Sequence, residues 1–64
     1  MKTYIRRFGA REDAFQWMRS LNHATLDGSI YCMTDGPEDD YAVVDLRTAI
    51  DLAIDLGLPY EWAR

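Results

Sequence analysis

Hydrophobic residues recur with two different spacings along the chain, and the changes of spacing predict its elements. Residues 2–8 combine β-branched and aromatic residues with three cations and end at Gly9, which predicts a strand with one charged face. Between residues 11 and 24 the apolar positions recur every three or four residues, which predicts an amphipathic helix. The apolar face of this helix consists of Ala14, Trp17, Met18 and Leu21.

Two β-rich runs, residues 29–34 and 41–46, flank the acidic sequence Asp-Gly-Pro-Glu-Asp-Asp at residues 35–40. Turn-forming residues between two such runs predict a hairpin. Four carboxylates in one short loop also suggest a calcium or magnesium site. The loop lacks the alternating acids of an EF-hand, however, so we expect a solvated turn and no metal.

Apolar residues return to helical spacing from residue 46 to 56, and this stretch is more apolar than the first helix. We expect Asp45 or Thr48 to cap the start of this helix and Gly57 to end it. Residues 58–63 then alternate in period two, which predicts either a short last strand or an extended tail.

The predicted order is strand, helix, strand, strand, helix and a final strand, within one domain at residues 1–64. Two strand-helix-strand units joined by a hairpin give an α+β fold with a small antiparallel sheet and both helices on one face. This is the ferredoxin-like arrangement. Without the last strand, the fold becomes a reduced version with three strands.

A chain of 64 residues forms a small core, and a single cysteine, Cys32, excludes an internal disulfide. Self-association is one remedy for so small a core. A homodimer is therefore an alternative, and it could cover a sheet face that presents Tyr4, Phe8, Tyr31 and Met33. The sequence has no apolar run of signal-peptide or membrane-spanning length, so we expect a cytoplasmic protein.

No group of residues in the sequence has recognisable catalytic roles. Ser20 and His23 are three residues apart on the predicted first helix, but no acid is placed to orient the imidazole. Cys32 lies in a predicted strand with no neighbouring cation to stabilise a thiolate, so we expect it to fill the core. We therefore predict that the protein is not an enzyme and needs no cofactor.

Two short segments, Thr3-Tyr4-Ile5 and residues 41–46, faintly resemble the two signatures of the RNA-recognition motif. The resemblance implies aromatic side chains that stack on bases and cations that hold phosphate. Asp39 and Asp40 stand where that family has a basic residue and glycine, and a pI near 4.6 disfavours phosphate binding. Nucleic-acid binding by the first strand is thus the alternative function. Its residues would be Lys2, Tyr4, Arg6, Arg7 and Arg11.

Charge is unevenly distributed along the chain. Residues 1–25 carry five cations and two acids, whereas residues 26–64 carry nine acids and two cations. This pattern predicts a domain with oppositely charged ends whose acidic side attracts a basic protein surface. The favoured hypothesis is an acidic protein-protein interaction module. In kind it is similar to phage or mobile-element inhibitors, including anti-CRISPR and DNA-mimic proteins, which act by occlusion. The expected contact residues are Glu38, Asp39, Asp40, Asp51, Asp55, Tyr60 and Trp62.

Overall fold

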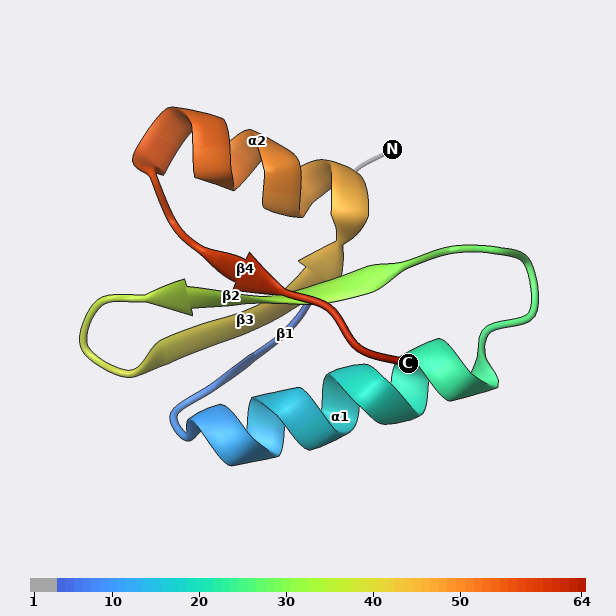
Figure 1. Ribbon diagram of the computed structural model, residues 1–64. Coiled ribbons are helices and arrows are strands. Elements are labelled where there is room, and N and C mark those ends of the chain that lie inside the picture. Colours follow the sequence, from blue (N-terminus) through green and yellow to red (C-terminus); the bar gives the residue numbers. More distant parts are fainter. Residues whose placement is uncertain (1–3) are drawn as a thin grey trace.

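The computed structural model of the chain describes residues 4–64 (Figure 1). It contains two helices and a four-stranded antiparallel sheet, which confirms the predicted α+β class and element order. The last strand is present but short. The elements are β1 (Tyr4–Phe8), α1 (Arg11–Ala24), β2 (Tyr31–Gly36), β3 (Asp40–Asp45), α2 (Leu46–Leu56) and β4 (Tyr60–Glu61).

The sheet has the strand order β1-β3-β2-β4, so the hairpin strands β2 and β3 lie at its centre. Residues 37–39 form the hairpin turn, in which Glu38 and Asp39 both have a φ of 58°. β4 pairs with β2 through Met33 opposite Glu61, and the N–H of Asp35 donates to the carbonyl oxygen of Pro59. The hairpin that carries the acidic turn and the strand that carries Tyr60 are therefore neighbours in one sheet, and Trp62 follows that strand.

The two helices cover opposite faces of the sheet (Figure 1). Met33 and Val43 face α1 and are fully buried with Ala14 and Met18. On the other face, buried residues from β2, β3 and α2 form a second cluster, namely Cys32, Ala42, Val44 and Ala49. The prediction that both helices share one face is therefore wrong.

The position of β4 explains this difference. α1 connects β1 to β2 and α2 connects β3 to β4, and both connections move across the sheet from the β1 edge toward the β4 edge. The first crossover starts from β1 and the second from β3, and these two strands run in opposite directions. Two crossovers that move the same way across the sheet from antiparallel strands have the same hand only if their helices lie on opposite faces of the sheet. Crossovers between parallel strands are almost always right-handed, so pairing of β4 with β2 favours the arrangement observed.

Opposite placement of the helices also buries the surface that we expected to be available for a homodimer. Phe8 and Tyr31 pack against the cluster under α1, and Met33 has no exposed surface. Met33 is therefore not available for a homodimer contact, and Phe8 and Tyr31 are partly covered by the α1 side of the core; the homodimer itself stays a prediction.

The two helices are buried to different extents. α1 buries Ala14, Met18 and Asn22, which lie four residues apart along one face. In α2 only Ala49 is buried, although α2 is the more apolar helix. Several apolar side chains of α2, namely Ile50, Ile54 and Leu56, are therefore exposed to solvent. Asp45 precedes the first turn of α2, and Gly57 ends the helix with a φ of 70°.

No helix within residues 4–64 is both long enough and apolar enough to cross a membrane.

Candidate functional site

A groove of about 480 Å³ lies between α2 and the sheet, and residues of β1, β2 and β3 line it together with residues of α2. This volume is within the range of ligand sites in proteins. The groove has an apolar floor from β3 and an apolar wall from α2 and the segment that follows it. Its lining consists of Arg7, Thr34, Gly36, Pro37, Asp40, Ala42, Val44, Thr48, Leu52, Leu56 and Leu58.

The interior of this groove offers few free polar groups. Ala42 and Val44 form a floor that is almost fully buried. The hydroxyl of Thr34 donates to the carbonyl oxygen of Ala42 at 3.2 Å. The hydroxyl of Thr48 donates to the Asp45 carboxylate at 2.5 Å. Because both hydroxyl hydrogens are used within the protein, the groove favours an apolar group over a polar one.

The rim of the groove is mainly acidic. Asp40 lies in the lining and forms an ion pair with Arg7 at 3.5 Å. Asp51 and Asp55 are four residues apart on α2 and lie on the solvent side of the groove-lining residue Thr48. Neither forms an ion pair with any residue in the described part of the chain. A cation at the rim would therefore meet uncompensated negative charge.

The structure gathers only part of the predicted contact set around the groove. Asp40 lines it, and Glu38 and Asp39 directly follow the lining residue Pro37 in the hairpin turn. Tyr60 and Trp62 are exposed, as expected for contact residues, but neither lines the groove.

Sequence reasoning missed the three leucines that form the groove wall. The apolar spacing placed Leu52 and Leu56 on the second helix and Leu58 in the last segment, but it did not predict a groove there or that Leu56 is 67% exposed. The available signal was the high apolar content of α2, which exceeds what one face of a helix can bury on a small sheet.

The predicted separation of charge does not extend to three dimensions. Arg7 pairs with Asp40, and Arg11 pairs with Glu61 of β4. Each pair joins the basic front of the sequence to its acidic remainder. The hydrogen bond from Arg11 to Glu61 is also the main reason why the pKa of Arg11 is raised. The domain therefore does not have one basic end and one acidic end.

These ion pairs also weaken the alternative nucleic-acid site. Of its predicted residues, Lys2 lies outside the described residues, and Tyr4 is the first residue of β1. Arg6 stacks over Phe8 at 5.0 Å and over Trp17 at 5.8 Å, so it packs on aromatic faces of this protein. Since Arg7 and Arg11 contact carboxylates, the described part of this surface has less unpaired positive charge than the sequence predicted, which disfavours phosphate binding there.

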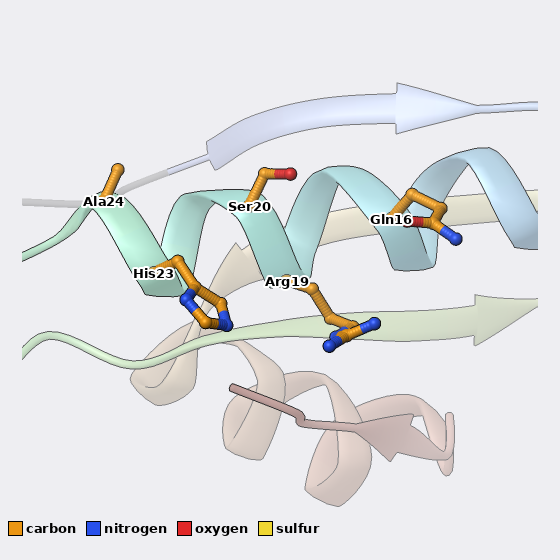
Figure 2. Close-up of a pocket in the computed structure, with 5 residues that line it drawn as sticks. All are labelled: Gln16, Arg19, Ser20, His23 and Ala24. Atoms are coloured by element: carbon orange, nitrogen blue, oxygen red, sulfur yellow. The ribbon is translucent and has the colours of Figure 1, made fainter.

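A second, shallow surface site lies entirely on the exposed side of α1 (Figure 2). Ser20 and His23 point to different sides of the helix, and the structure shows no hydrogen bond between them. Arg19 lies near His23, where a catalytic dyad would need an acid. The geometry offers no nucleophile with an adjacent base at this position.

Cys32 is fully buried beneath α2, and loss of solvent raises the pKa of its thiol to about 11, with a further contribution from Asp45. Its thiol is therefore protonated near neutral pH and is not a nucleophile. Within residues 4–64, no three His, Cys, Asp or Glu side chains are grouped so that they could hold a metal ion.

The fold and the groove together define a small α+β domain with an apolar surface groove bordered by acids. No family model, curated protein or solved structure matches the chain.

Proposed function

We propose that the chain is a non-enzymatic interaction module that binds another protein through the α2 groove. The partner would insert an apolar side chain between α2 and β3 and place neighbouring cations against the acidic rim. One observation carries this proposal: the groove combines an apolar interior with a rim on which Asp51 and Asp55 have no cationic partner among the described residues.

The wall of the groove supplies the energetic reason for binding. Leu56 is 67% exposed in the free protein, and Leu52 and Leu58 are partly exposed beside it. Complete burial of a leucine side chain contributes roughly 1.5–3 kcal/mol. An apolar centre surrounded by a polar rim is also the usual anatomy of a protein interface.

The negative charges around the groove favour a partner with a basic surface. The chain has a net charge of −4, and four acids near the groove, Glu38, Asp39, Asp51 and Asp55, have no ion pair with any residue from 4 to 64. Such a rim would accelerate association with a basic surface and repel an acidic one. The partner segment we expect is therefore apolar and basic, and an acidic peptide would not bind.

In this proposal the protein acts by occupying a surface that the partner needs for its own activity. Small inhibitors from phages and mobile elements, including anti-CRISPR and DNA-mimic proteins, act in this way. The proposal places the protein in the cytoplasm with its partner, which normally binds an anionic ligand. Occlusion requires no catalytic group, and the groove contains none with a recognisable acid or base role.

The test is affinity capture from a host lysate at low salt, followed by mass spectrometry. Leu56→Arg places a cation in the groove wall, and Leu26→Arg makes the same change at a residue that is 95% exposed and does not line the groove. We expect the native chain and Leu26→Arg to retain the same protein, and Leu56→Arg to lose it. Absence of any captured protein, or equal capture by the two variants, would contradict the proposal.

A further inference from the structure

The flank of α2 opposite the groove carries a second exposed apolar surface. Thr48 and Leu52 line the groove. Ile50 follows Thr48 by two residues, and Ile54 follows Leu52 by two residues. A step of two residues turns a helix by a little more than half a turn, so both isoleucines lie on the side of α2 away from the groove. Ile54 is 76% exposed and Ile50 is 38% exposed. Of the six exposed large apolar residues in the described part of the chain, five fall between residues 50 and 62.

Both isoleucines belong to α2 and lie one helical turn apart, so they form one continuous apolar strip. We call Ile50 and Ile54 the outer α2 surface.

The charges along α2 run opposite to the order that its dipole favours. Arg47 lies in the first turn, where the helix carries partial positive charge, and Asp55 lies in the last turn, where the charge is partly negative. The first turn contains no acid and the last turn no base. Arg47 has no carboxylate partner within residues 4–64. Each end of α2 thus presents one sign of charge that its own domain leaves unpaired.

A helix that is positive at its start and negative at its end is complementary to a second copy that runs in the opposite direction. We propose that two copies of this chain associate through the outer α2 surface with their α2 helices antiparallel. A two-fold axis near the middle of α2 places Ile50 of one copy opposite Ile54 of the other. The same axis brings Arg47, in the first turn of each helix, toward Asp55, in the last turn of its partner.

The small core of the domain gives this association a physical reason. α2 contributes only Ala49 to the fully buried residues, while its two isoleucines face water. Domains of this size bury a smaller fraction of their surface on folding than larger domains do, and oligomerisation is one common way to stabilise them. An antiparallel α2 pair would cover both isoleucines and leave the apolar lining of the groove open, while Arg47 of each copy would pair with Asp55 at the groove rim of the other copy. The dimer goes beyond the proposed function and does not require it.

Sedimentation equilibrium over a range of concentrations tests this inference with the protein alone. We expect the mass to rise from 7.4 kDa toward twice that value. Ile54→Asp should keep the chain monomeric, because it places a charge at the centre of the apolar contact. Circular dichroism of the same samples would show that α2 remains folded.

Charge variants distinguish this geometry from other modes of association. Arg47→Glu makes both ends of α2 acidic, and since every contact occurs twice in a two-fold dimer, we expect dimer affinity to fall roughly tenfold or more. Adding Asp55→Arg to that variant reverses the charge at both ends of α2 and should restore the dimer. Arg19→Glu makes the same charge change on α1 and should have little effect.

Several results would overturn the inference. These are a monomer at every concentration up to the millimolar range, a dimer that survives Ile54→Asp, and equal effects of Arg47→Glu and Arg19→Glu. Capture of a partner protein in the affinity experiment is independent of all three, so the two proposals can fail separately.

Discussion

The side chain of Asn22 is a buried polar group that joins three parts of the chain. Its amide donates hydrogen bonds to the carbonyl oxygens of Tyr31 and Ala63, at 3.0 and 2.8 Å, and its oxygen accepts one from the N–H of Tyr31 at 2.8 Å. Asn22 is 4% exposed. It therefore pairs with the backbone of Tyr31 as a neighbouring strand would, and it fixes the segment after β4 against α1.

We predict that Asn22→Ala destabilises the domain by about 2.5 kcal/mol. Three hydrogen bonds contribute roughly 1 kcal/mol each to the free energy of unfolding. Alanine has a higher helix propensity than asparagine, which offsets about 0.5 kcal/mol of that loss. A domain of this length has a total stability of roughly 3–10 kcal/mol, so the loss is a large fraction of it. With a denaturant dependence of about 1 kcal/mol per molar urea, the unfolding midpoint should fall by about 2.5 M.

Urea unfolding followed by tryptophan fluorescence measures this change. His23→Ala is the matched control, because it gives a similar gain in helix propensity at the next residue, which is exposed. Hydrogen exchange should also show that the Tyr31 amide loses protection only in Asn22→Ala. If the two variants unfold within about 0.5 kcal/mol of each other, the bonds to Tyr31 and Ala63 do not stabilise the fold as argued.

Two further predictions concern the centre of the sheet. A Cβ at Gly36 would lie 2.8 Å from the backbone oxygen of Asp40, so Gly36→Ala should destabilise the domain by roughly 1–3 kcal/mol in thermal unfolding. Gly9→Ala, where no atom lies within 4 Å, should be tolerated, and equal losses would refute the steric argument. The pKa of about 11 for Cys32 leaves roughly one thiol in a thousand ionised at pH 8. Iodoacetamide should therefore modify Cys32 only after unfolding, and rapid alkylation of the native protein would contradict its burial.

The groove for a partner protein and the contact between two copies of the chain lie on different sides of α2. The groove lies on the flank that carries Thr48 and Leu52, whereas the outer α2 surface carries Ile50 and Ile54. A dimer built on one flank would present two grooves that face away from the shared helix pair. Such a molecule could engage two partner sites at once, which raises the apparent affinity when their spacing matches.

The sequence by itself determined the elements of this protein, because their signals are local. Apolar spacing predicted the first helix at residues 11–24, turn residues predicted the hairpin, and Gly57 marked the end of α2. Each of these depends on side chains within a few residues of one another. The hydrophobic pattern also placed Cys32 correctly in the core.

Only the tertiary structure decided which faces the helices cover and where the charges meet. Pairing of β4 with β2 is a long-range choice, and it moved α2 to the face opposite α1. The same arrangement brought Arg7 to Asp40 and Arg11 to Glu61, so charges that are separate in sequence became neighbours. The groove followed for the same reason: its floor and its leucine wall come from strands and a helix whose relative positions no local pattern records.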